Sequence, residues 1–224
     1  MRASALVAAL ACGLAALVAC DAGLSNPFAS FEARCTALPA TRFDIVAVPV
    51  RYAEDDTQSI DQLTLKSGKT PATHMTFGLT TANFGHRSEI EIHSLEDKAG
   101  GRACGTLQVR VEVSMRPMTV YLAHEIGISR CARTATFEHE MKHVAVFEAV
   151  LAEAARDLDA GIGARVGTGT QYAASRAELE SRQNAAVAAY LSQFMADYQR
   201  VLHERQDAVD SPEEHARVKG ACPS

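Results

Sequence analysis

Residues 137–144 read Phe-Glu-His-Glu-Met-Lys-His-Val and contain the spacing H-E-x-x-H. Histidines four residues apart lie one turn apart on one face of an α-helix, with Cβ atoms about 5–6 Å apart. His139 and His143 can therefore bind one Zn²⁺ ion together. Glu140 can take a proton from water on the metal without occupying a coordination position. The pattern predicts a zinc site with Glu140 as general base, although an ordinary solvated helix with a charged face has a similar composition.

The apolar periodicity around this motif predicts two long helices. The first begins between Arg133 and Thr136 and continues to about Asp159, with apolar residues at three- and four-residue steps. The stretch Gly161-Ile162-Gly163 is expected to end it. A second helix is predicted over residues 173–208, and the glycine-rich connection favours antiparallel packing of the two helices.

The residues before the motif alternate between polar and apolar and predict a β-rich half. Predicted strands cover residues 43–52, 72–84, 88–93, 107–113 and 118–123, and residues 96–101 form a loop. The expected fold is α+β, with a small antiparallel β-sheet followed by two long helices on one side of it. In zincins, an edge strand beside the H-E-x-x-H helix holds an extended substrate by main-chain hydrogen bonds. Residues 118–125, one connection ahead of the motif, resemble that strand in position and are expected to take its role.

Length and composition are those of a globular protein with one domain. The chain has 224 residues, of which 47% are hydrophobic and 22% charged, and its net charge is −5. Its basic residues are scattered and fewer than its acidic ones, so nucleic acid is not an expected partner. We expect a single domain over residues 43–224, preceded by a linker over residues 20–42.

The first residues have the pattern of an export signal. Met1-Arg2 gives a positive start, and a 15-residue apolar run, Ala5 to Ala19, follows it. The sequence Leu17-Val18-Ala19-Cys20 resembles a bacterial lipobox, which predicts a lipoprotein signal peptide over residues 1–19 and a lipid on Cys20. A plain secretory signal that is cut nearby is the alternative. The pattern predicts a lipid-anchored protein of the cell envelope or periplasm of a Gram-negative bacterium, and leaves inner and outer membrane open.

Four cysteines remain after the predicted signal. They are Cys35, Cys104, Cys131 and Cys222, and an even number in an exported chain favours two disulfides, for which three connectivities exist. A bridge from Cys131, just upstream of the motif, to Cys222 near the C-terminus would hold the tail beside the metal. Cys35 would then pair with Cys104.

A catalytic zinc site needs a third protein ligand and an open fourth position for water. The metzincin extension of the motif requires glycine and histidine where this chain has Val146 and Ala149. A thermolysin-like glutamate about twenty residues after His143 would fall on Gly163. Neither pattern fits, and further candidates for the ligand are Glu148, Asp157, Asp159 and His203.

The tail supplies a better candidate. The stretch Asp210-Ser211-Pro212-Glu213-Glu214-His215 resembles the closing Asp-x-x-Thr-x-His segment of an uncharacterised family of exported bacterial proteins with a zincin-like H-E-x-x-H helix, except that Glu213 replaces the threonine. The resemblance implies His215 as the third metal ligand, with Asp210 orienting an imidazole or binding in its place. The same letters also fit a short helix that begins at Ser211 with Pro212 in its first turn.

The motif and this resemblance predict a zinc-dependent metallopeptidase of the bacterial envelope that hydrolyses a peptide or another amide bond. Its expected partners are a peptide or protein substrate and the membrane, through Cys20. Tyr198 and His203 are candidates for stabilising the oxyanion. The alternatives are a non-catalytic metal-binding or structural envelope lipoprotein, and an adaptor that presents the 173–208 helix to a partner.

Overall fold

A computed structural model of the chain describes residues 29–222. The predicted signal peptide and Cys20 lie outside these residues. Within the described part, none of the helices combines the length and the apolar character that crossing a bilayer requires.

The sheet is built around one long central strand, β4 (Arg102–Leu122). Strand β3 (Gly78–Asp97) pairs with it in antiparallel fashion along one side. The other side is shared by β5 (Gln171–Ala173), which is antiparallel, and by β1 (Arg42–Ala47) and β2 (Ala53–Asp55), which are both parallel to β4. The five-stranded sheet is therefore mixed, and the prediction of a purely antiparallel sheet is wrong.

Strands β1 and β2 follow the same register along β4, with Arg42 opposite Gln108 and Ala53 opposite Thr119. They belong to one extended run of chain that is interrupted near Pro49, a residue with no backbone N–H to donate to the ladder. Alternation of polar and apolar residues is the same in parallel and antiparallel pairs, so it did not reveal the direction of this run.

Strands β3 and β4 form a hairpin that is longer than predicted. The predicted strands 72–84 and 88–93 overlap the single strand β3, 107–113 lies within β4, and 118–123 ends one residue beyond β4. A shift of register between Ala82 and Phe84 lets β3 continue without a break. The hairpin turns within the predicted loop, where Gly101 has a φ of 60°.

Residues 118–122 of β4 lie inside the sheet, because β2 pairs with residues 119–121 on one side and β3 pairs along the other. The prediction that this segment is an edge strand is wrong. Strands β2 and β3 each pair only with β4 among the described residues, so they are the two edges of this part of the sheet.

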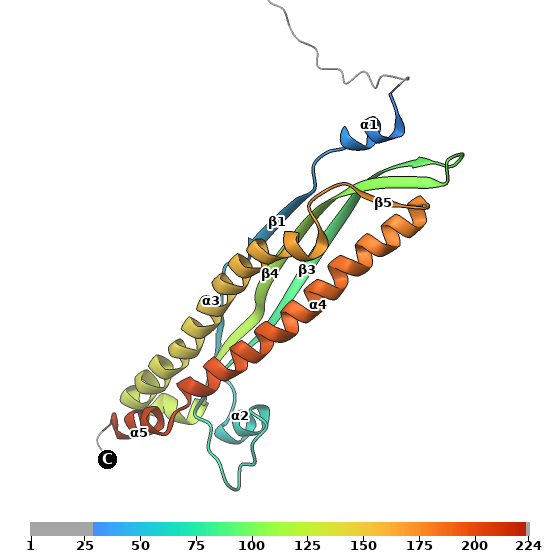
Figure 1. The fold of residues 1–224 in the computed structure, drawn as a ribbon. Coiled ribbons are helices and arrows are strands. Elements are labelled where there is room, and N and C mark those ends of the chain that lie inside the picture. The colour runs from blue at the N-terminus through green and yellow to red at the C-terminus, as the bar shows by residue number, and fades with distance from the viewer. Residues whose placement is uncertain (1–28, 223–224) are drawn as a thin grey trace, which may run out of the picture.

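Two long helices, α3 (Arg130–Val166) and α4 (Arg176–Val209), run antiparallel along one face of the sheet (Figure 1). Helix α3 continues through Gly161 and Gly163, contrary to prediction, and is followed by Gly167, whose φ of 99° breaks the helical path. Gly161 allows close packing instead, since a Cβ there would lie 2.5 Å from the Tyr190 hydroxyl of α4.

The core lies between the sheet and these two helices. Alternate residues of β4, including Val109, Val111 and Val113, pack against apolar side chains of α3 and α4 such as Leu151 and Leu191. The opposite face of the sheet carries charged residues such as Asp44, Arg110 and Glu112. Helices on one side of the sheet are therefore confirmed.

Four short helices complete the fold. They are α1 (Phe31–Thr36), α2 (Ile60–Lys66), the 3-10 helix η1 (His124–Ile128) and α5 (Pro212–Gly220). Helix α5 begins at Ser211 with Pro212 in its first turn, as one interpretation of the tail expected.

Two disulfides join parts of the chain that are distant in sequence. One links Cys35 to Cys104 and the other links Cys131 to Cys222, which is one of the three connectivities that the sequence left open. The first joins α1 to the start of β4, and the second joins the start of α3 to the segment after α5, at the opposite end of the molecule (Figure 1).

Candidate metal centre

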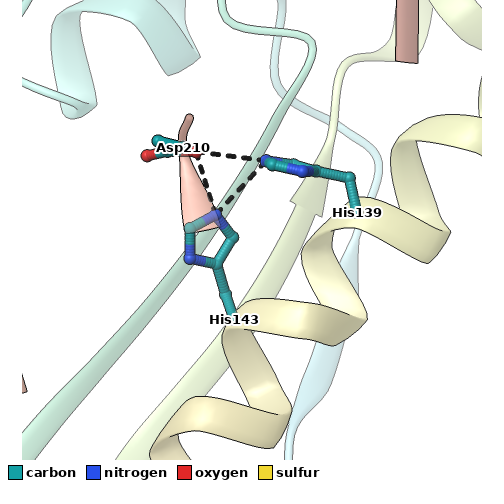
Figure 2. Close-up of side chains that lie close together, drawn as sticks. All are labelled: His139, His143 and Asp210. Atoms are coloured by element: carbon teal, nitrogen blue, oxygen red, sulfur yellow. Dashed lines mark hydrogen bonds and ion pairs between the residues drawn. The ribbon is translucent and has the colours of Figure 1, made fainter. Parts of the chain in front are cut away.

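The side chains of His139, His143 and Asp210 converge on one point (Figure 2). Asp210 lies just before α5, which is found at one end of the molecule in Figure 1. The Nε2 atoms of His139 and His143 are 3.3 Å apart, and each is 3.2 Å from Oδ1 of Asp210. Both histidines are buried, with exposures of 8% and 9%, and Asp210 is exposed. Together the three atoms form a group that could hold a metal ion.

Helix geometry brings these residues together. His139 and His143 lie one turn apart on α3, as the motif predicts. Helix α4 runs back along α3 and ends at Val209, so its C-cap residue, Asp210, arrives beside the two imidazoles. The contact between residues about 70 positions apart therefore depends on the antiparallel packing of α3 and α4.

The hydrogen bonds of Gln206 assign the tautomer of His143. The amide nitrogen of Gln206 donates to the carbonyl of His143 at 3.2 Å, so the amide oxygen faces the ring, 2.5 Å from Nδ1. This oxygen can only accept, so Nδ1 carries the hydrogen and Nε2 presents a lone pair.

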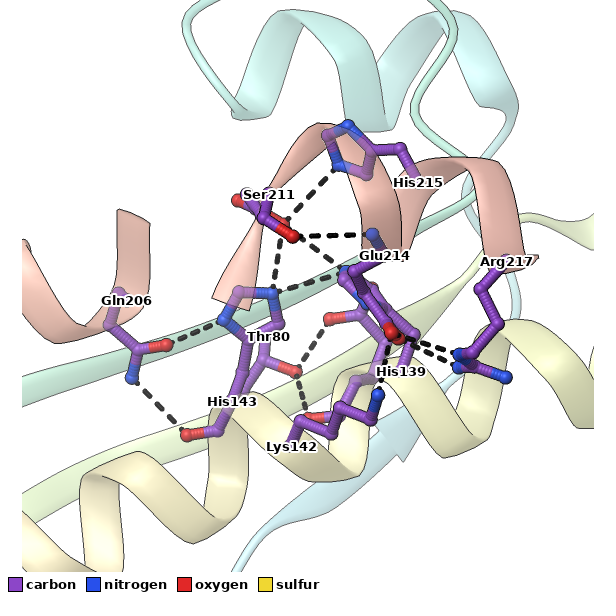
Figure 3. A network of polar contacts seen from close by, with 11 residues as sticks. Thr80, His139, Lys142, His143, Gln206, Ser211, Glu214, His215 and Arg217 are labelled. Carbon is purple, nitrogen blue, oxygen red and sulfur yellow. Dashed lines mark hydrogen bonds and ion pairs between the residues drawn. The ribbon is translucent and has the colours of Figure 1, made fainter. Parts of the chain in front are cut away.

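His139 is held in the same tautomer by a carboxylate. Its Nδ1 atom lies 3.3 Å from Oε1 of Glu214, which accepts the ring N–H (Figure 3). Two imidazole lone pairs and one carboxylate oxygen therefore face a common point. Three acceptors at such short mutual distances repel one another unless a positive charge lies between them.

The direction of the pKa shifts agrees with this demand for positive charge. When a proton is also bound at Nε2, the imidazole donates it to Asp210, and such hydrogen bonds from His139 and His143 hold the pKa of Asp210 far below its usual range. Asp210 raises the pKa of His139 against the effect of burial. Burial lowers the pKa of His143, but its hydrogen bonds with Asp210 and Gln206 outweigh burial and raise it overall. Without a metal, a proton takes the place of the cation.

Glu140 lies on the side of α3 that faces β3. Its side chain is buried and its Oε2 atom accepts a hydrogen bond of 2.8 Å from the Thr80 hydroxyl. Burial raises the pKa of Glu140, while Thr80 and the neighbouring His143 lower it. Gly78 leaves space for the carboxylate, because a Cβ there would lie 2.4 Å from Oε1. The start of β3 thus fixes the position of the predicted base.

Glu214 is surrounded by positive charge. Lys142 lies 2.7 Å from its Oε2 atom, and Arg217 donates to both carboxylate oxygens, at 2.9 and 2.7 Å (Figure 3). Arg217 and Lys142 hold the pKa of Glu214 far below its usual range. The carboxylate therefore stays ionised while it accepts the N–H of His139.

His215, which the tail resemblance implies as third ligand, lies next to the three donors. Its Nε2 atom is 3.6 Å from Oδ1 of Asp210, and its ring centroid is 6.1 Å from that of His139. Its side chain is 57% exposed. The group of donor atoms that could hold a metal ion includes Asp210 and does not include His215.

The remaining sequence candidates lie elsewhere. The hydroxyl of Tyr198 donates to Asp157, which lies roughly four helical turns beyond His143, so Tyr198 does not reach the three donors. His203 is exposed on α4 and lies 3.5 Å from Asp207. The expectation that Tyr198 stabilises an oxyanion at this site is therefore not met, whereas the role of His203 stays a prediction. Glu148 and Asp159 are also exposed, outside the group of three donors.

Sequence reasoning missed three residues of this site: Thr80, Gln206 and Glu214. Glu214 was named only as part of the tail segment 210–215, without a role of its own. Gln206 precedes Asp210 by one helical turn, so helical periodicity places both residues on the same face of α4. This spacing could have identified Gln206. The threonine gave no signal, since its role depends on how β3 packs against α3.

Comparison with known protein families, curated proteins and solved structures finds no significant match to this chain. The function is therefore argued from the geometry of the three donors and from the residues that surround them.

Proposed function

We propose that the protein is a zinc-dependent hydrolase of the metallopeptidase type, with His139, His143 and Asp210 as metal ligands. The mutual distances of the three donor atoms, 3.2 to 3.3 Å, carry this proposal. Donors at about 2 Å from a tetrahedral zinc ion are separated by distances of this size. The atoms are thus spaced as one face of a coordination tetrahedron.

The donor set favours zinc and a catalytic role. Two imidazole nitrogens and one carboxylate oxygen are ligands that zinc accepts readily. Three protein ligands leave the fourth tetrahedral position for water, as in catalytic sites, whereas structural sites use four protein ligands. The Nδ1 atoms of His139 and His143 are hydrogen-bonded to Glu214 and Gln206, respectively. Metal-binding histidines commonly have such a partner on the nitrogen that does not bind the metal.

In the proposed reaction, Glu140 is the general base that transfers a proton from water to the leaving group. Zinc in this site would supply Lewis-acid activation of water and polarisation of the substrate carbonyl. Glu140 accepts the proton of the attacking water and passes it to the leaving amine. Burial, which raises its pKa, makes the carboxylate a stronger base, and the hydrogen bond from Thr80 orients it.

The edge of β3 is suited to an extended peptide. Thr80 lies on this strand and contacts Glu140, and the strand pairs only with β4 among the residues that the structure describes. A peptide that pairs with the free edge would run past the proposed base. We therefore propose a peptide or protein substrate, bound as an added strand.

The proposal includes the setting expected from the sequence: a zincin-like domain in the envelope of a Gram-negative bacterium, anchored by lipid on Cys20. The signal pattern of residues 1–19 and the two disulfides, which are typical of exported proteins, support it.

The test is the zinc content of the mature protein, purified without chelators or a histidine tag and measured by elemental mass spectrometry. We expect about one zinc per chain, lost in His143→Ala. His203→Ala is the matched control, since His203 is an exposed histidine on α4. Glu140→Gln should keep the metal and lose hydrolysis of a peptide library. A protein that takes up no added zinc would refute the proposal.

A further inference from the structure

Glu214 connects the metal centre to the C-terminal helix. Its side chain is 12% exposed and its carboxylate contacts three residues: His139, Lys142 and Arg217. His139 and Lys142 both belong to the H-E-x-x-H segment of α3, whereas Glu214 and Arg217 belong to α5 (Figure 3). The carboxylate thus bridges two helices.

We propose that Glu214 is a positioning residue that fixes the ring and tautomer of His139 for metal binding, and that it couples metal binding to the docking of α5. This inference rests on the proposed metal site. It gives a role to Lys142, one of the two unspecified positions of the motif.

The first step concerns the imidazole of His139. In the neutral ring the hydrogen can lie on either nitrogen. Only the tautomer with hydrogen on Nδ1 leaves a lone pair on Nε2 for the metal. An ionised carboxylate 3.3 Å from Nδ1 accepts that hydrogen and disfavours the other tautomer. Lys142 and Arg217 hold the carboxylate in place from two other directions.

The second step concerns the attachment of α5. None of its residues is buried, so apolar packing contributes little to holding it against α3. Its polar links to α3 are the contacts of Glu214 with His139 and Lys142, beside the Cys131–Cys222 disulfide. Because the same carboxylate orients a metal ligand and holds the helix, the metal and the docked helix should stabilise each other.

Glu213 provides a matched control. It is the other acidic residue in the first turn of α5, so it has a similar effect on the helix dipole. Its side chain is exposed and makes no hydrogen bond or ion pair with any residue in the described range 29–222. Glu213→Gln therefore removes a charge from the same turn and leaves the contacts of Glu214 intact.

The experiment measures zinc affinity by competition with a chelating dye for wild type, Glu214→Ala, Glu214→Gln and Glu213→Gln. Loss of a partner of a metal-binding histidine lowers affinity about 10–100-fold. We expect a loss of this size for Glu214→Ala, a smaller one for Glu214→Gln, whose amide oxygen still accepts the ring N–H, and none for Glu213→Gln. Equal affinity of wild type and Glu214→Ala would overturn the inference.

A second measurement separates this inference from the proposed function. Nitrogen NMR of metal-free protein in alkaline solution reports the tautomer of His139 directly. Wild type should carry hydrogen on Nδ1 in a larger fraction of molecules than Glu214→Ala, even if wild type binds no zinc, because loss of Glu214 leaves Asp210, 3.2 Å from Nε2, as the carboxylate that accepts from this ring. Failure of wild type to bind zinc would refute the proposed function alone, whereas an unchanged tautomer in Glu214→Ala would refute the role of Glu214.

Discussion

Gly78 lies directly against the carboxylate of Glu140: a Cβ on Gly78 would come within 2.4 Å of Oε1. Two residues further along β3, Thr80 donates a hydrogen bond to the other carboxylate oxygen. A strand residue without a side chain and a strand hydroxyl therefore determine together where the proposed base lies.

This contact predicts the effect of Gly78→Ala. The added methyl group should displace Glu140, so hydrolysis should fall at least tenfold while zinc stays bound. Gly85→Ala is the control, because it lies on the same strand and its Cβ would meet no atom within 4 Å. Peptide hydrolysis and zinc content of the two variants are compared. Equal activity would show that the position of Glu140 does not depend on Gly78.

The third ligand can be identified by comparing Asp210→Ala with His215→Ala. Asp210 lies 3.2 Å from both Nε2 atoms, so its loss should weaken zinc binding more than about 100-fold, beyond the range typical of residues that act through a ligand. His215→Ala should change zinc affinity much less. The reverse order, measured by competition with a chelator, would assign the third position to His215 as the tail resemblance implies.

The two disulfides should differ in their effect on the metal. They close loops of 69 and 91 residues, so the chain-entropy relation gives each a similar contribution of about 4–5 kcal/mol to the free energy of unfolding. Replacing both cysteines of either pair by serine should lower stability alike. Only loss of Cys131–Cys222, which holds α5, should also lower zinc affinity of the folded protein.

These variants are compared by denaturant titration and by zinc competition under conditions where circular dichroism shows folded protein. A similar loss of zinc affinity in the variant without Cys35–Cys104 would show that general stability, and not the tail, controls the site.

Zinc affinity should rise with pH. Asp210 raises the pKa of His139, and hydrogen bonds outweigh burial to raise that of His143. Because both histidines have a raised pKa in the folded state, their protonation stabilises the metal-free protein fully at a pH below the ordinary histidine pKa. This contribution to stability is lost as the pH rises through the pKa of the folded state. Zinc must displace these protons. The zinc-induced increase in Tm should therefore grow between about pH 6 and about pH 8, and an increase that is independent of pH would contradict the displacement of protons.

The sequence predicted the local part of the site. His139, Glu140 and His143 follow from helical periodicity, which acts over one turn and needs no knowledge of the fold. Asp210 came into view only through the resemblance of the tail, and Glu214 and Thr80 were missed. Their approach to α3 depends on where a helix 34 residues long ends and on how a strand packs, which no local pattern records.

In the fold, too, features with a local sequence pattern were predicted, and features that depend on long-range packing were missed. The two long helices were predicted because their apolar residues recur at helical spacing. Helix α2 was missed, although Ser59 and Gln62 form a capping box that the sequence displays. The parallel direction of β1 and β2 was also missed, because side-chain alternation carries no information on direction.

Strand β4 is long enough to separate α1 widely from the proposed metal centre. Cys104, near one end of the strand, is tied to α1, and Leu122, at the other end, pairs with Gly78 beside Glu140. An extended strand rises about 3.3 Å per residue, so roughly 60 Å separate these ends. If the chain is anchored through Cys20, which precedes α1, the proposed centre can reach substrates well away from the lipid surface, such as components of the cell wall.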